Sequence, residues 1–187
     1  MAKLIKAAGP MKMRDPLENG FAALVRSIMY QQLAGAAAAT IHGRFLNLFA
    51  DGLSPAAVLA LPEGAMRSAG VSGSKAAAIA DLALKVGDGT VPLHDVESLS
   101  DDDLVARLVQ VRGIGRWTAE MFLMFQLGRL DVWPVDDYGV RKGWALAHKL
   151  KDLPTPRALQ PEGDLFRPYR SVAAWYCWRA VDTVLPA

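Results

Sequence analysis

Residues 108–137 read LVQVRGIGRWTAEMFLMFQLGRLDVWPVDD, and this stretch carries the main signals for both fold and binding. Two glycines, Gly113 and Gly115, flank one apolar residue between two segments of helical character. Glycine permits a positive φ and has no side chain, so backbone N–H groups there can approach an anion closely. We expect the next helix to begin at Arg116, where its free N–H groups and dipole favour a phosphate. The stretch therefore predicts a hairpin that binds a nucleic-acid backbone without reading its sequence.

We assign the hairpin to five consecutive residues: Arg112, Gly113, Ile114, Gly115 and Arg116. Ile114 is the expected buried residue that holds the turn. The backbone carbonyls of Val109, Val111 and Gly113 could point outward together and share a monovalent cation, Na⁺ or K⁺, that bridges to a phosphate; this is an inference from geometry alone. A bare Gly-x-Gly also occurs at ordinary corners between helices.

An acidic pair, Asp136 and Asp137, follows Pro134 about twenty residues after the hairpin. Acidic side chains are favoured at a helix N-terminus by capping and by the helix dipole. We expect Asp136 to cap the next helix and Asp137 to lie in its first turn, with Val140 as the apolar anchor. Either both acids only cap the helix, or one carboxylate can act on what the hairpin binds.

The whole chain has the pattern of an all-α fold. It has 187 residues, of which 52% are hydrophobic and 21% charged, so it can bury a core and is not expected to be disordered. Apolar residues recur at helical spacing almost throughout, and no run shows convincing strand-like alternation. Stretches rich in glycine and proline, such as residues 153–163, are expected to be connections between short helices.

The charge and cysteine content narrow the class of protein. A net charge of +2 is weak evidence for nucleic acid by itself. The single cysteine, Cys177, excludes an intramolecular disulfide, a cysteine-based zinc site and a four-cysteine iron–sulfur cluster. No apolar run reaches bilayer length, and the first residues lack the apolar core of a signal peptide. We therefore expect a soluble cytoplasmic protein.

The longer strings resemble a known family. GIGRWTAEMF (113–122) followed by DVWPVDDYGVRKG (131–143) is similar to the helix-hairpin-helix–GPD superfamily of DNA glycosylases, specifically its 3-methyladenine DNA glycosylase II group. The chain looks like a minimal form without that group's extra N-terminal domain. LVRSIMYQQLAGAAAATI, GVSGSKAAAIADLA and YRSVAAWYCW extend the resemblance over roughly residues 20–181. It implies two helical lobes with a DNA-binding cleft: a central lobe of about 30–130, and a second of about 1–29 plus 131–187.

In that group the second acid of the pair, here Asp137, is catalytic, so the resemblance implies an N-glycosyl hydrolase of base excision repair. Breaking the glycosidic bond builds positive charge on the sugar, which a carboxylate stabilises while it orients or deprotonates a water. A neutral leaving base needs a proton from a second acid, but His42, His94 and His148 lie far from the motif in sequence. Bases made cationic by alkylation, such as 3-methyladenine and 7-methylguanine, need none and are therefore favoured.

Trp117 stands where bifunctional relatives carry a lysine that forms a Schiff base with the sugar. Tryptophan cannot form one. We therefore expect a monofunctional enzyme that leaves an abasic site and requires neither a cofactor nor an iron–sulfur cluster.

A flipped base needs a pocket, and an aromatic ring face attracts a cationic base. The candidate pocket residues are Trp117, Met121, Tyr138 and Trp178. Gln32 and Leu33 are the candidates for the plug that fills the gap in the duplex. Aromatic residues at helical spacing also pack in cores, and the plug residues could be a loop contact. The best-known member has tyrosine and leucine in place of Met121 and Gln32, which leaves the substrate range open.

Two alternatives to an alkylbase glycosylase stay open. One is a non-catalytic helix-hairpin-helix module that binds bent or damaged duplex. The other is an oxidised-base glycosylase/lyase, which Trp117 and the missing cluster cysteines disfavour. In each case the expected partner is double-stranded DNA containing damaged bases, with no membrane involved. We expect a monomer associated with the nucleoid of a bacterial-type cell.

Overall fold

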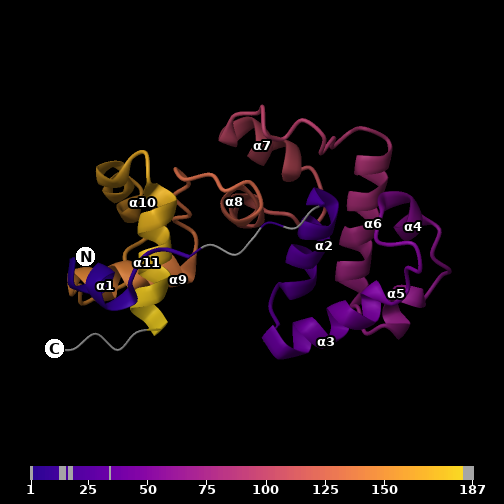
Figure 1. Cartoon of the computed structure of the whole chain (residues 1–187), viewed down its shortest axis with the longest axis horizontal. Helices are drawn as coiled ribbons and strands as arrows, with labels where there is room; N and C mark the ends of the chain where they lie inside the picture. Colours follow the sequence, from indigo (N-terminus) through magenta and orange to yellow (C-terminus); the bar gives the residue numbers. More distant parts are fainter. Residues whose placement is uncertain (1, 13–15, 17–18, 34, 183–187) are drawn as a thin grey trace. The chain divides into compact units, whose positions relative to one another are not determined.

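The computed structural model describes residues 2–12, 16, 19–33 and 35–182. Every regular element in these residues is helical, as the periodicity predicts (Figure 1). In this part of the chain, no helix combines the length and apolar character required to cross a bilayer. The elements in chain order are α1 (Ala2–Ala8), α2 (Gly20–Tyr30), α3 (Gly35–Leu46), α4 (Pro55–Leu59), α5 (Ala65–Ser68), α6 (Gly73–Gly87), α7 (Asp101–Leu108), α8 (Arg116–Phe125), α9 (Tyr138–His148), α10 (Pro156–Leu159), the 3₁₀ helix η1 (Pro161–Phe166) and α11 (Arg170–Asp182).

Residues 153–163, expected to be a connection, instead contain α10 and the start of η1. Thr155 caps α10, because its hydroxyl oxygen accepts a hydrogen bond from the backbone N–H of Ala158 at 3.2 Å. Pro156 occupies the first helical position, where its missing N–H leaves no bond unmade. The prolines that suggested a loop therefore begin short helices.

The chain divides into two units, Leu17–Phe122, and Met1–Pro16 with Leu123–Ala187. The sequence expectation placed residues 1–29 outside the central lobe. In the structure α2 packs against α3 and α6, so it belongs to the unit Leu17–Phe122. The reason is its buried face, which includes Leu24, Val25 and Ile28.

The unit Leu17–Phe122 is arranged around α6, which contacts α2, α4 and α5 (Figure 1). Ser72 caps α6 by accepting a hydrogen bond from the backbone N–H of Lys75 at 3.4 Å. The next turns bury Ile79 and Leu82, both with no measurable exposure. This long central helix supports both the hairpin and the turn that follows α2.

In the other unit, α11 packs along α9 (Figure 1). Gly143 makes this approach possible, because a Cβ built there would lie 1.8 Å from the carbonyl oxygen of Cys177. The hydroxyl of Tyr176 donates to the carbonyl of Gly9 at 2.9 Å and ties the start of the chain to α11. The pair α9–α11 carries the acidic site.

Candidate functional site

The predicted hairpin lies between the end of α7 and the start of α8 at Arg116. Gly113 has φ +77°, in the left-handed region, and a Cβ there would lie 3.1 Å from the Cβ of Ala78 on α6. Glycine is thus favoured at this position by its backbone conformation, and the packing against α6 leaves little room for a side chain. Ile114 is only 3% exposed, as expected for the residue that holds the turn.

α6 also holds the hairpin by polar contacts. The backbone N–H of Arg112 donates to Oδ2 of Asp81 at 2.7 Å, and Lys85 donates to the same oxygen at 2.9 Å. The backbone hydrogen bond from Arg112, together with Lys85, lowers the pKa of Asp81 below its ordinary value. A carboxylate on α6 therefore fixes the backbone at the start of the hairpin.

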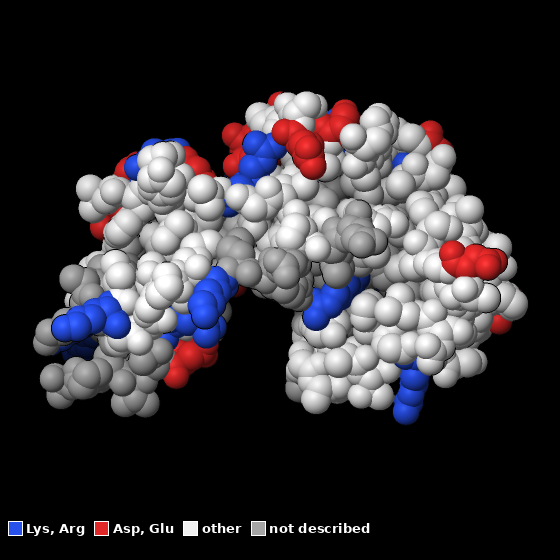
Figure 2. Space-filling view, in the orientation of Figure 1, with Lys and Arg blue, Asp and Glu red and all other residues white. Residues whose placement is uncertain are grey.

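The charged side chains of the hairpin are exposed. Arg112 and Arg116 are both at the surface, and Nε of Arg116 donates to the buried Glu120 at 3.1 Å. Acidic side chains gather over α7, whose first turn contains three aspartates at residues 101–103 (Figure 2). The positive charge of Arg112 and Arg116 is therefore confined to the hairpin, and α7 next to it in the chain is acidic.

Two of the three carbonyls suggested as cation ligands take part in hydrogen bonds. The oxygen of Val111 accepts from the backbone N–H of Ile114 at 3.1 Å, and that of Gly113 accepts from Nε2 of Gln31 at 3.0 Å. A carbonyl oxygen has two lone pairs, so each retains acceptor capacity. No group of three or more His, Cys, Asp or Glu side chains that could hold a metal occurs within the described residues.

The acidic pair is placed differently from the sequence expectation. Asp137, not Asp136, is the N-cap of α9: its Oδ1 accepts from the backbone N–H of Val140 at 2.7 Å. The expectation that Asp136 caps the helix was wrong. The backbone N–H of Asp137 bonds to the carbonyl of Pro134 at 3.0 Å, which closes a turn through Asp136 and starts the helix one residue later. Asp136 is left exposed, whereas Asp137 is 9% exposed.

Trp178 on α11 completes the environment of this carboxylate. Its Nε1–H donates to Oδ1 of Asp137 at 2.8 Å, and its ring stacks on Phe125 with centroids 5.6 Å apart. A Cβ at Gly139 would lie 2.7 Å from the Trp178 ring and 3.1 Å from Oδ1 of Asp137. The contact therefore depends on glycine two residues after the acid. Sequence reasoning missed this role, although the spacing Asp-x-Gly was visible.

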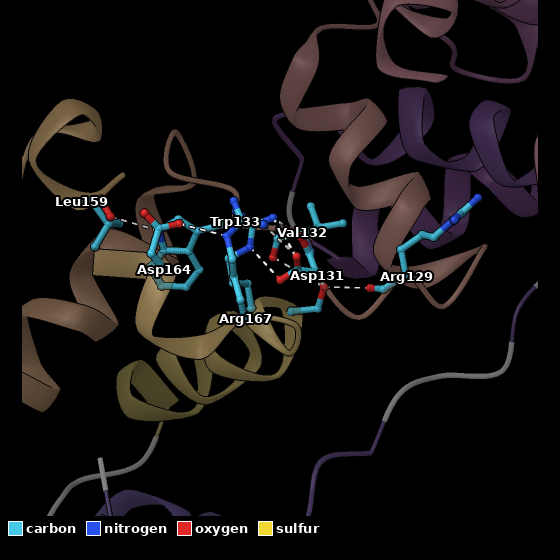
Figure 3. A network of polar contacts seen from close by, with 9 residues as sticks. Arg129, Asp131, Val132, Trp133, Leu159, Asp164 and Arg167 are labelled. Carbon is cyan, nitrogen blue, oxygen red and sulfur yellow. Dashed lines mark hydrogen bonds and ion pairs between the residues drawn. The ribbon is translucent and has the colours of Figure 1, made fainter. Parts of the chain in front are cut away.

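The segment before Asp137 is anchored to the start of α11 (Figure 3). Asp131 accepts from Nε of Arg170 at 2.7 Å and from Nη1 of Arg167 at 2.9 Å. The hydrogen bond from Arg170 is the main cause of the lowered pKa of Asp131. Nε1 of Trp133 donates to the carbonyl of Leu159 at 3.0 Å. These contacts, which the sequence analysis did not identify, fix the approach of the chain to Asp137.

Cys177 lies next to this site and is buried. Burial, and then the negative charge of Asp137, raise the pKa of its thiol to about 12. Because the thiolate is the reactive form of cysteine, Cys177 is a packing residue and not a nucleophile.

The remaining candidates differ in exposure. Tyr138 is 63% and Trp117 is 41% exposed, while Met121 and Trp178 are half-buried. Trp117 and Met121 belong to the unit Leu17–Phe122, and Tyr138 and Trp178 to the other.

The plug candidates follow α2. Gln32 and Leu33 are both exposed, and Gln32 has φ +54°, so the chain turns sharply there. An exposed leucine in a turn of defined backbone is available for contact with a partner.

Comparison with known proteins places this arrangement in a family. The model of the HhH-GPD superfamily base excision DNA repair proteins matches residues 25–168. DNA-3-methyladenine glycosylase 1 of Schizosaccharomyces pombe is 34% identical over 186 residues, which cover 95% of this chain and 80% of the relative.

Two solved structures are similar over nearly the whole chain. The 3-methyladenine DNA glycosylase of Schizosaccharomyces pombe in complex with abasic DNA has a TM-score of 0.88 at 31% identity, covering 100% of this chain and 93% of that one. A DNA-3-methyladenine glycosidase from Bacillus halodurans has a TM-score of 0.88 at 34% identity, covering 97% and 84%. With its hairpin and its acid at the N-cap of α9, this chain belongs to the HhH-GPD superfamily of base excision DNA repair proteins.

Proposed function

We propose that this protein is a monofunctional DNA glycosylase that flips alkylated bases out of duplex DNA and releases them by hydrolysis, leaving an abasic site. The observation that carries this function is the placement of Asp137, a buried carboxylate oriented by the N-terminus of α9 and by Trp178. The family, and a relative named as a 3-methyladenine glycosylase, support the same activity.

Double-stranded DNA is the proposed partner, bound through the hairpin by a monomer in the cytoplasm. The hairpin leads into the N-terminus of α8, where the helix dipole favours a phosphate, and Arg112 and Arg116 add positive charge at the surface. A Cβ at Gly115 would meet no described atom within 4 Å, so internal packing does not demand glycine there. Close approach of the DNA backbone to the hairpin would explain the glycine at position 115. The solved relative from Schizosaccharomyces pombe holds abasic DNA, the kind of product that a glycosylase leaves.

The proposed chemistry assigns Asp137 one role. As the bond between sugar and base breaks, positive charge develops at the anomeric carbon, and a carboxylate held nearby stabilises it. The same carboxylate orients or deprotonates the attacking water. Alkylated bases such as 3-methyladenine and 7-methylguanine leave as neutral molecules without added protons, so this mechanism needs no second acid.

Two residues support the proposal that hydrolysis is monofunctional. Trp117 cannot form a Schiff base with the sugar. Cys177 stays protonated, because the pKa of its thiol is raised to about 12.

Recognition of the flipped base is assigned to three aromatic side chains and one methionine. We propose that Trp178, already stacked on Phe125, presents a ring face to the cationic base, as cation–π attraction requires. Trp117, Met121 and Tyr138 are the proposed further contacts.

We assign to the turn after α2 the role of filling the gap that the flipped base leaves in the duplex. Gln32 and Leu33 are the proposed plug, because both are exposed and the positive φ of Gln32 turns the chain there.

A monovalent cation is proposed at the carbonyls of Val109, Val111 and Gly113, where it would bridge the hairpin to a phosphate. Its test is duplex affinity at constant ionic strength, with K⁺ or Na⁺ replaced by tetramethylammonium, which is too large for such a site. Equal affinity in all three salts would contradict this cation.

The experiment that tests the function uses matched substitutions of the acidic pair. Duplexes carrying 3-methyladenine, 7-methylguanine, hypoxanthine, ethenoadenine or 1-methyladenine are incubated with protein, and abasic sites are cleaved by alkali. Asp137→Asn should lower release by about 100-fold or more, as expected for loss of charge stabilisation, while duplex affinity is kept. Asparagine is a good N-cap, so α9 should remain folded.

Asp136→Asn is the control, because Asp136 is exposed at the adjacent position and should change release little. Release by Asp137→Asn at the wild-type rate would contradict the mechanism. Wild-type binding without any release would identify a DNA-binding module instead. A covalent adduct trapped by borohydride would identify a lyase.

A further inference from the structure

Gln31 lies where the chain leaves α2 and enters the turn that carries Gln32 and Leu33. It is the C-cap of α2, with its backbone N–H bonded to the carbonyl of Ile28 at 3.4 Å. Its side chain is half-buried, whereas the two residues after it are exposed. Any force that fixes Gln31 therefore fixes the base of the proposed plug.

The side-chain amide of Gln31 reaches the hairpin, although 82 residues separate it from Gly113. Its Nε2 donates to the carbonyl of Gly113 at 3.0 Å and to the hydroxyl of Thr118, in the first turns of α8, at 3.2 Å. Both hydrogens of the amide are thus used on the hairpin and the helix that follows it. Thr118 is 3% exposed, so this end of the link is anchored in the core.

The backbone of Gln31 is held by a second group, a lysine on α6. Nζ of Lys75 donates to the carbonyl of Gln31 at 2.8 Å and to that of Met29 at 2.7 Å. These carbonyls lie at the C-terminal end of α2, where a cation is favoured by the helix dipole. Desolvation lowers the pKa of the Lys75 ammonium group, as expected for a side chain that is directed into the protein.

We infer, on the basis of the glycosylase function proposed above, that Gln31 is a positioning residue that holds the plug in register with the hairpin. The hairpin sets where the DNA backbone lies, and Gln31 sets where Gln32 and Leu33 stand relative to that backbone. Opening the duplex is unfavourable until the gap is filled. A plug held in place needs no further ordering when the base leaves, which lowers the free-energy cost of flipping.

A pair of substrates separates this role from a general structural one. In the first duplex 7-methylguanine is paired with cytosine, so the plug must replace a stacked and paired base. In the second, 7-methylguanine lies opposite a tetrahydrofuran abasic analogue, which leaves the lesion unpaired and easier to flip. A defect in flipping affects the first duplex more, whereas a defect in folding or binding affects both equally.

Gln31→Leu keeps the size of the side chain and removes both N–H donors. We expect the single-turnover release of 7-methylguanine to fall about tenfold from the paired duplex, the scale expected for hydrogen bonds of this kind, and less than about twofold from the unpaired duplex. Thr118→Val removes one of the two acceptors and should give a smaller loss with the same selectivity. Thermal unfolding and affinity for undamaged duplex should stay close to wild type.

The matched control is Gln110→Leu. Gln110 is an exposed glutamine near the hairpin, and its amide donates to the carbonyl of Ala106 at 3.4 Å, in its own helical turn. We expect wild-type release from both duplexes. In a background with Gln32→Ala and Leu33→Ala, Gln31→Leu should cause little further loss, because the residues it positions are gone.

Equal losses from the two duplexes, or a full further loss in the plug-deficient background, would overturn the role of Gln31. If the wild-type protein releases 7-methylguanine from neither duplex, the proposed glycosylase function on this base fails, and the role of Gln31 fails with it.

Discussion

Asp137 serves as helix cap and as candidate reactive group with a single carboxylate. The side-chain oxygen Oδ1 accepts hydrogen bonds from the backbone N–H of Val140 and from Nε1 of Trp178. A backbone donor on its own helix and a side chain from α11 therefore both help to orient the carboxylate. Such fixed dipoles need no reorganisation as charge develops on a substrate.

Replacement of Gly139 tests the contact between Trp178 and Asp137. Alanine is normally favoured over glycine inside a helix by about 1 kcal/mol. At position 139 its Cβ would lie 2.7 Å from the Trp178 ring, so the ring must move away from Asp137. We expect Gly139→Ala to lower the rate of base release about tenfold and to lower the melting temperature.

The control is Gly43→Ala in α3. A Cβ at Gly43 would meet no described atom within 4 Å, so this change should stabilise the protein and leave base release unchanged. Stabilisation by both substitutions, with release unaffected, would show that Trp178 does not depend on Gly139.

The pair of helices α9 and α11 is the element on which the acidic site depends. α9 begins at the Asp137 cap, α11 carries Trp178, and the helices approach each other at Gly143. A close approach of two backbones tolerates very little added volume. The geometry of the carboxylate is therefore coupled to the packing of these helices.

Gly143→Ala tests this coupling. The added Cβ would overlap the backbone of Cys177, at 1.8 Å from its carbonyl oxygen, so one helix must shift. We expect the free energy of unfolding to fall by about 2 kcal/mol or more, and base release to fall with it. Denaturant unfolding and single-turnover release measure the two effects. An unchanged free energy of unfolding would mean that the close contact of α9 and α11 at Gly143 does not contribute to stability.

At the scale of the whole molecule, stability depends on pH through buried or paired carboxylates. Hydrogen bonds and charge from Arg170 and Arg167 lower the pKa of Asp131 in the folded state. A carboxyl with a depressed folded pKa stabilises the protein above its unfolded pKa, about 3.9, and this stabilisation is lost as the pH falls through the folded pKa.

Asp131→Asn should therefore reduce the loss of unfolding free energy as the pH falls from about 5 towards 3. Asp81 and Asp95, whose pKa values are also lowered, keep part of the acid sensitivity in this variant. Denaturant unfolding across this pH range measures the slope. Parallel curves for the variant and the wild type would rule out a contribution from Asp131.

The sequence by itself determined the features that depend on near neighbours in the chain. Helical periodicity, the glycine turn at 113–115 and the acidic helix start at 136–137 arise from contacts within about four residues, so local patterns reveal them. Even here the cap was misplaced by one residue, because the turn closed by Pro134 decides where α9 begins.

Only the tertiary structure decided which distant residues meet. Trp178 and Asp137 are 41 positions apart, Arg170 and Asp131 are 39 apart, and Gln31 and Gly113 are 82 apart. Each contact depends on how whole helices pack, and packing is set by the volume and shape of many side chains together. The candidate acid and the hairpin were therefore readable from the chain, whereas the groups that hold them in place became visible only in three dimensions.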